Sequence, residues 1–241
     1  MTMSEHTIKA FDADLQDLTR VVVEMGGLAE RQIVNALEAL EKHDTALAQR
    51  VIADDGKIDA LQREVEEKAI LTIARRQPMA VDLREVVGAL RLSNDLERVG
   101  DLAKNIAKRV GALDTDFQPQ QVMRGVEHMT DLVLGQLKAV LDAYARRDLN
   151  KAMAVWRGDE EIDAVCTSVF RELLTYMLED PRNITFCIHL MFCAKNVERM
   201  GDHATNIAET VHYVIDGRPI TETRPKGDTT TLATQKAAAG R

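Results

Sequence analysis

The chain has 241 residues and a formal net charge of −8, from 31 basic and 39 acidic side chains. An apolar fraction of 45% is enough to bury a core, whereas an aromatic fraction of only 4% argues against a β-sandwich or β-barrel. The acidic balance argues against direct binding to nucleic acid, which usually requires a basic face.

Three features of the sequence bear on the cellular location of the protein. No apolar run has the length of a membrane span, and residues 1–9 lack the apolar segment of a secretory signal. The three cysteines are odd in number and include no C-x-x-C pair, so a disulfide framework is not expected. We therefore expect a cytoplasmic protein.

Helical periodicity fills nearly the whole chain. Pro78, Pro119 and Pro181 separate long periodic stretches, and Asp44 and Asp148 are suited to begin new helices as N-caps. The expected helices span about 25–35 residues each, and their ranges are 8–42, 45–75, 79–111, 120–146, 149–178 and 183–216. The stretch 218–241 has no apolar periodicity, and we expect it to be a disordered tail.

The chain repeats itself. Residues 44–60 match residues 148–164 at seven of 17 positions, and residues 94–110 match residues 195–211 at nine of 17 positions. Both pairs keep their order and nearly keep their spacing. The simplest explanation is the duplication of a three-helix unit, and short connections make neighbouring helices antiparallel within each bundle.

Each repeat carries acidic pairs spaced by four residues, which places both carboxylates of a pair on one helix face. At 100° per residue, Glu97 and Asp101 point away from the apolar side formed by Leu96, Val99 and Ala103. We therefore expect the carboxylates to line a surface groove or a cleft between bundles. The eight candidate metal ligands are Asp55, Asp59, Glu97 and Asp101 in the first repeat and Asp159, Asp163, Glu198 and Asp202 in the second.

Clustered carboxylates repel one another. A like-charged pair spaced by four residues destabilises a helix by about 0.2–0.5 kcal/mol, and two adjacent pairs raise one another's pKa values. A hard cation removes this cost, because carboxylate oxygens suit Mg²⁺, Ca²⁺, Mn²⁺ and iron. This pattern favours a multinuclear metal site, and the alternative is a plain solvated acidic face neutralised by nearby Arg or Lys.

The residues beside these pairs allow narrower expectations. Gly100 and Gly201 lie inside helices, where glycine costs about 1 kcal/mol, and close helix packing is the usual compensation. Arg98 and Arg199 are suited to intramolecular salt bridges or to an anionic partner. His203 is either a partly exposed helix residue or a further metal ligand. Cys187 and Cys193 flank an apolar stretch and are expected to be buried thiols.

The two repeated blocks resemble the PhoU family of phosphate-transport accessory proteins. That family carries two E-R-x-G-D blocks in tandem three-helix bundles, and the resemblance covers about residues 5–217. It implies an all-α fold with bundles at residues 5–113 and 118–217. The blocks that carry it are Leu96-Glu97-Arg98-Val99-Gly100-Asp101 with Asn105-Ile106-Ala107, and Val197-Glu198-Arg199-Met200-Gly201-Asp202-His203-Ala204 with Asn206-Ile207-Ala208-Glu209.

The resemblance also implies a function. Such proteins are negative regulators of the bacterial phosphate-starvation response, and they couple the high-affinity phosphate ABC transporter, through its ATPase subunit, to a membrane sensor histidine kinase. Family members bind metal clusters through these acidic motifs, so Fe, Zn, Mn or Mg is expected here, and many form homodimers. The second block has the fuller ending, and Lys195 replaces Asn94 there, so the two sites are expected to differ in metal occupancy or affinity.

Two other functions compete with a regulatory adaptor that lacks catalysis. One is a carboxylate-bridged di-metal enzyme of the ferritin-like kind, which usually places Glu-x-x-His pairs inside a four-helix core. No such pair occurs at these motifs, and the carboxylates point away from the apolar side. The other is a metal-independent helical scaffold. The sequence favours the adaptor.

Overall fold

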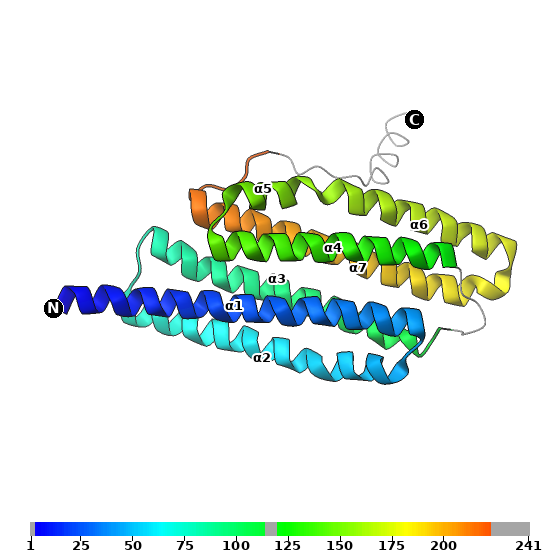
Figure 1. Ribbon diagram of the computed structural model, residues 1–241, viewed down its shortest axis with the longest axis horizontal. Helices are drawn as coiled ribbons and strands as arrows, with labels where there is room; N and C mark the ends of the chain where they lie inside the picture. Colours follow the sequence, from blue (N-terminus) through cyan, green and yellow to red (C-terminus); the bar gives the residue numbers. More distant parts are fainter. Residues whose placement is uncertain (1–2, 114–119, 223–241) are drawn as a thin grey trace, which may run out of the picture.

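The computed structural model describes residues 3–113 and 120–222, without the side chains of residues 3–10 and of Asp159, and over these residues it is helical without any strand. The predicted all-α class is confirmed, and the part of the predicted tail at 223–241 lies outside the described residues. The long helices run side by side along the long axis (Figure 1). The elements are α1 (Met3–Lys42), α2 (Thr45–Arg76), α3 (Val81–Val110), α4 (Gln120–Arg146), α5 (Leu149–Arg157), α6 (Asp159–Glu179), the 3₁₀ helix η1 (Pro181–Asn183) and α7 (Ile184–Asp216).

Acidic N-caps set several helix starts. Asp44 Oδ1 accepts a hydrogen bond from the backbone N–H of Leu47 at 2.8 Å, and Asp148 Oδ1 accepts one from Lys151 at 3.0 Å. Each bond satisfies a backbone donor that has no partner inside the first helical turn. The helix starts predicted after Asp44 and Asp148 are therefore confirmed.

The helix predicted at 149–178 is instead two helices, α5 and α6, which meet at Gly158. The backbone N–H of Gly158 donates to the carbonyl of Val155 at 3.0 Å, and its own carbonyl accepts from Gln136 Nε2 at 2.9 Å. Glycine has little helix propensity, and the Gln136 side chain offers its carbonyl a partner outside the helix. The break therefore depends on a residue of α4, which periodicity cannot reveal.

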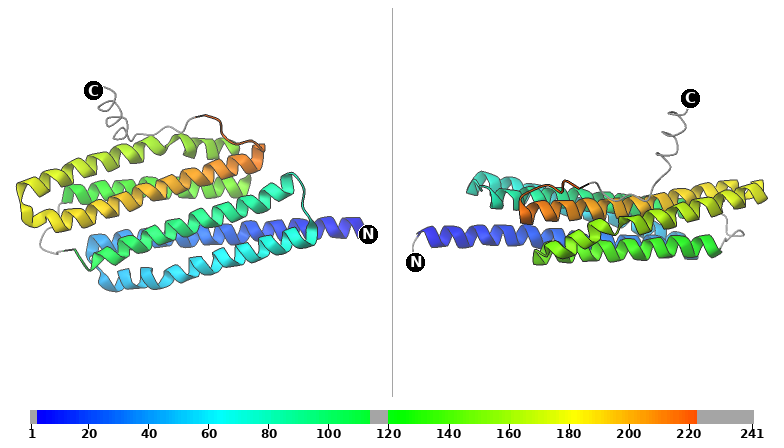
Figure 2. Two further views of the ribbon diagram at one scale, coloured as in Figure 1. Left: turned by 180° about the vertical axis from the view of Figure 1, so that it is seen from behind. Right: turned by 90° about the horizontal axis from the view of Figure 1, so that it is seen from above.

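Two three-helix bundles share one core. The first consists of α1, α2 and α3, the second of α4, α5–α6 and α7, and they join where α3 packs along α7 and α1 packs against α4. Seen from above, α1 and α4 form one layer and α3 and α7 form the other (Figure 2). Cys187 and Cys193 are fully buried in this core, as predicted. The largest side chains within it include Leu18, Met25, Ile33, Leu92, Leu96, Met129, Leu137 and Leu190.

The halves run in opposite directions. The turn between α2 and α3 lies at one end of the molecule, and the turn between α6 and α7 lies at the other (Figures 1 and 2). The outer helices α2 and α5–α6 occupy opposite edges, so each has one neighbour-free flank. Corresponding parts of the two repeats are therefore displayed at opposite ends.

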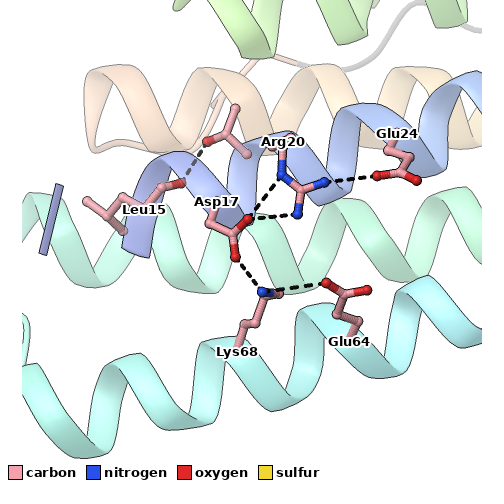
Figure 3. Close-up of polar contacts among 7 residues, drawn as sticks. Leu15, Asp17, Arg20, Glu24, Glu64 and Lys68 are labelled. Atoms are coloured by element: carbon pink, nitrogen blue, oxygen red, sulfur yellow. Dashed lines mark hydrogen bonds and ion pairs between the residues drawn. The ribbon is translucent and has the colours of Figure 1, made fainter. Parts of the chain in front are cut away.

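Ion pairs fasten the outer helix α2 to α1 (Figure 3). Lys68 on α2 donates to Asp17 on α1 and lies 3.5 Å from Glu64. Asp17 also accepts from Arg20 Nε at 3.0 Å, and Arg20 reaches Glu24 at 3.0 Å. Such partly exposed pairs each contribute little to stability. Their geometry helps to hold the register of α2, which in turn positions the acidic side chains of that helix.

No helix among the described residues is both long enough and apolar enough to cross a membrane.

Candidate functional site

A glycine on the third helix of each bundle lets the second helix approach. A Cβ built at Gly100 would lie 2.8 Å from Ile58 Cδ1 of α2, and one built at Gly201 would lie 2.9 Å from Ile162 Cδ1 of α6. The two contacts involve corresponding residues of the repeat. The close packing predicted for Gly100 and Gly201 is confirmed, and it brings the acidic residues of α2 and α6 against α3 and α7.

Asp55 lies in the first of these contacts and is only 5% exposed. Its Oδ2 accepts a hydrogen bond from Lys104 Nζ at 2.5 Å, and Asp101 Oδ1 accepts one from the same ammonium at 2.6 Å. Burial alone would lower the pKa of Lys104, but its bonds to the two aspartates outweigh that effect and raise it. Lys104 is therefore a firmly charged bridge between α2 and α3.

Glu97 completes the group on α3 and is partly buried. Burial raises its pKa, and the neighbouring charges of Asp101 and Asp59 raise it further. Burial also acts to raise the pKa of Asp101, but the ammonium of Lys104 outweighs this and lowers it. The structure thus brings Asp55, Asp101 and Glu97 together, with Asp59 close enough to act on Glu97 through its charge.

Arg98 remains mostly exposed at the rim of this group. Its guanidinium lies 3.5 Å from Glu97 Oε2 and 3.6 Å from Asp101 Oδ2. The intramolecular salt bridge expected for Arg98 is confirmed. An exposed pair of this kind is weak, so Arg98 tunes the charge of the rim more than it stabilises the fold.

The second half arranges the corresponding residues differently. Asp163 is buried at 8% exposure, and the side chain of Glu198 is 11% exposed. Lys195 Nζ donates to Glu198 Oε1 at 2.8 Å, while Glu198 Oε2 is buried without a hydrogen-bond partner. Burial raises the pKa of Glu198, Lys195 lowers it, and the charges of Asp202 and Asp163 raise it again, leaving it above the usual value. The side chain of Asp159 lies outside the described residues.

The eight carboxylates were expected to line a surface groove or cleft. Glu97 and Asp101 are half-buried, but Asp55 and Asp163 lie beneath the surface. The reason is the glycine contact, which draws α2 onto α3 and α6 onto α7 more closely than helices carrying larger side chains would approach. These two carboxylates therefore depend on a neighbouring positive charge.

The two halves differ in how well they suit a bound metal. Among the side chains that the structure describes, no three carboxylates, histidines or cysteines are grouped so as to hold a metal ion. In the first half an ammonium lies between Asp55 and Asp101, so the arrangement does not fit one. In the second half Lys195 bonds one oxygen of Glu198, and the other oxygen is buried without a hydrogen-bond partner. Metal binding at the eight predicted residues stays a prediction.

Contacts across the seam between the halves were not predicted. His203 Nδ1 on α7 lies 2.9 Å from Asp95 Oδ1 on α3, so His203 links the two halves. The metal-ligand alternative for His203 stays a prediction. The Arg109 guanidinium stacks over the ring of Phe192 with its centre 4.3 Å from the ring centroid. Lys104 was also missed, although its position three residues after Asp101 was a usable signal.

Two tandem three-helix bundles, each with acidic residues where its second and third helices meet, define a class of tandem-bundle proteins. The PhoU domain family matches residues 22–110 and 126–211, one match in each half. The chain belongs to the PhoU family, and the resemblance seen in the sequence is confirmed.

Relatives agree over nearly the full length. The chain is 57% identical over 225 residues to the phosphate-specific transport system accessory protein PhoU homolog of Rhizobium meliloti, covering 93% of this chain and 95% of the relative. It is 52% identical to the homolog of the same name from Caulobacter vibrioides, covering 94% and 98%. The crystal structure of PhoU from Pseudomonas aeruginosa superposes with a TM-score of 0.82 at 38% identity, covering 86% of this chain and all of that one.

Proposed function

We propose that this chain is a negative regulator of the phosphate-starvation response and an accessory protein of a phosphate-specific transport system. The observation that carries the proposal is the match to the Rhizobium and Caulobacter relatives, which bear that accessory name and align over more than nine-tenths of the chain. Proteins this similar share the fold. The proposed location is the cytoplasm, in line with the cysteine content.

Exposed apolar side chains at both ends support an adaptor role. At the turn between α2 and α3, Met79 is 80% exposed and Ile70 is 64% exposed. In the last turns of α6, Leu178 is 87% exposed and Leu174 is about half exposed, and Phe192, two turns into α7, is also about half exposed. Exposed apolar surface can serve as a binding site for partners. Exposed apolar side chains towards opposite ends suit a protein that couples the transporter ATPase subunit to a sensor histidine kinase.

Metal binding belongs to this proposal. Asp163, Glu198 and Asp202, together with Asp159, are the residues that would hold a hard cation such as Mg²⁺ or Mn²⁺ in the second half. The support is the buried, unpartnered Oε2 of Glu198 and the raised pKa that crowding and burial impose on its carboxyl. When bound, a cation would supply positive charge that holds α6 and α7 together.

We propose no catalytic activity and a homodimeric assembly. In the first half, the lysine bridge ties up Asp55 and Asp101, which a di-metal enzyme would need as ligands. This favours the adaptor over the ferritin-like enzyme. Light scattering of the purified chain tests the assembly: a mass near twice 26.9 kDa is expected, and a monomer at micromolar concentration contradicts it.

Deletion of the gene in its source organism tests the regulatory role. Expression of phosphate-starvation genes is expected to rise in phosphate-replete medium, and re-expression of the native chain should restore repression. Expression that stays repressed in the deletion strain would remove the regulatory proposal. Co-purification of the chain with the transporter ATPase subunit and the sensor kinase tests the coupling, and failure to retain either one contradicts the adaptor role.

A further inference from the structure

Lys104 occupies the centre of the first acidic group. Its ammonium is within 2.6 Å of an oxygen from each of two aspartates, one on α2 and one on α3. Its side chain is only 22% exposed, and the side chain of Asp55 beneath it is 7% exposed. The packing of Gly100 against Ile58 holds α2 and α3 together at this level, and a Cβ at Gly100 would lie only 3.6 Å from Asp55 Oδ1. The position of the ammonium is therefore built by the fold.

A buried carboxylate is stable only with a compensating charge. Lys104 supplies it from within the chain, so its effective concentration at the two aspartates far exceeds that of any dissolved ion. A divalent cation that used Asp55 and Asp101 would have to displace the ammonium, because one oxygen of each aspartate already accepts its hydrogen bond. Lysine and metal are thus mutually exclusive occupants.

The second half has a different residue at the corresponding place. Lys104 aligns with Thr205, which is buried and donates its hydroxyl hydrogen bond to the carbonyl of Gly201. The lysine near that acidic group is Lys195, which is about half exposed and bonds only one oxygen of Glu198. The repeat therefore keeps its carboxylates in both halves but carries the buried, bridging lysine in the first.

We infer that Lys104 is a built-in cation that replaces a divalent metal in the first half, so that Asp55 and Asp101 of the native chain bind none. The inference stands on the geometry around these two aspartates. It does not depend on the proposed metal binding of the second half.

Replacing Lys104 by methionine tests the inference, because methionine keeps much of the side-chain volume and removes the charge. We expect the Lys104→Met chain to bind about one Mn²⁺ more than the native chain in equilibrium dialysis. Without divalent ions, in EDTA, its Tm should fall by about 5–10 °C, and Mn²⁺ should restore most of that loss. Lys108→Met, which removes an exposed lysine one turn further along α3, serves as the matched control and should change neither quantity.

A second set of variants tests the inference even if the Lys104→Met chain folds poorly. The double variant Lys104→Met/Asp55→Asn removes the buried charge together with its partner, and it should regain stability in EDTA without binding extra Mn²⁺. Asp101→Asn in the otherwise native chain should leave the Mn²⁺ content unchanged. Loss of Mn²⁺ in that variant would overturn the inference, because it would show that the first half of the native chain holds metal.

The outcomes separate this inference from the proposed function. If the native chain binds no Mn²⁺ but Lys104→Met does, the proposed metal site of the second half fails and the role of Lys104 stands. If the native chain binds Mn²⁺ and Glu198→Gln abolishes it, both stand. If Lys104→Met binds no more Mn²⁺ than the native chain and Mn²⁺ does not raise its Tm, the role of Lys104 is wrong.

Discussion

Single carboxylates differ sharply in how the fold compensates their charge. Asp55 is buried but has an ammonium within 2.5 Å, so its charge is matched. Glu41, near the end of α1, is only partly buried, yet its Oε1 has no hydrogen-bond partner. Burial raises the pKa of Glu41, and the charges of Glu127 and Asp131 on α4 raise it further. The ionised form of Glu41 therefore costs stability.

Glu41→Gln is expected to stabilise the protein near neutral pH. The folded-state pKa of Glu41 lies above its usual value of 4.5. The native chain therefore loses stability as the pH rises from the unfolded-state pKa to the folded-state pKa, and the loss is complete above the folded-state pKa. At about pH 7 the variant should gain roughly 1–3 °C in Tm, and at about pH 4 the gain should vanish. Thermal unfolding at both pH values measures this. Glu67→Gln, at an exposed position of α2, is the control, and an equal gain at both pH values would contradict the explanation.

Helices pack closely where the residue at their contact is a glycine. Gly100 and Gly201 occupy equivalent places in the repeat, and each faces an isoleucine of the preceding long helix. Gly56 on α2 is a contrasting case, since a Cβ there would meet nothing within 4 Å. The same residue type therefore serves packing at one position and only lowers helix propensity at another.

Substitutions of Gly100 and Gly56 should have opposite effects on stability. Gly100→Leu overpacks the α2–α3 contact and should lower the free energy of unfolding by about 1–3 kcal/mol. Gly56→Ala should raise it by roughly 0.5–1 kcal/mol, because alanine favours the helix and nothing obstructs its methyl group. Urea denaturation measures both. A Gly100→Leu chain as stable as the native one would refute the packing role.

The N-cap at the start of α5 can be tested separately. Asp148→Ala removes the acceptor of the Lys151 N–H bond and should lower the free energy of unfolding by about 1 kcal/mol. Asp148→Asn keeps a suitable oxygen and should retain most of the stability. If alanine and asparagine are equally destabilising in urea, the effect comes from the lost charge and the capping explanation fails.

At the scale of the whole molecule, the opposed halves place similar surfaces far apart. The exposed residue Met79 lies in the turn between α2 and α3, and the exposed residue Leu178 lies in the last turn of α6. These two places are at opposite ends of the molecule (Figure 1). A single partner that touched one end would not reach the other without spanning the length of the bundle. The arrangement suits two different partners better than one.

Met79→Asp and Leu178→Asp should each weaken one of the two proposed partners. Both side chains are more than three-quarters exposed, so the Tm should change by no more than about 2 °C. Co-purification with the transporter ATPase subunit and with the sensor kinase should show the loss of a different partner for each variant. Ala60→Asp, exposed in the middle of α2, is the control. Undiminished binding of both partners by both variants would contradict the assignment of the ends.

Much of the fold was accessible from local patterns, and the candidate site only in part. The helix starts after Asp44 and Asp148 were predictable because a cap and its first turn lie within a few residues. The break at Gly158 was not, because its carbonyl bonds a side chain of α4. Likewise, spacing placed Glu97 and Asp101 on one face but did not reveal that Asp55 is buried beneath them.

The amino-acid sequence by itself determined the helical class, the duplication and the acidic stripes, since periodicity and repetition are properties of neighbouring residues. Only the tertiary structure decided how each stripe is neutralised. Lys104 and Asp55 are 49 positions apart, and His203 and Asp95 are 108 apart. Such pairs form because helix packing brings distant turns to the same level, and the free energy of that packing depends on the whole core.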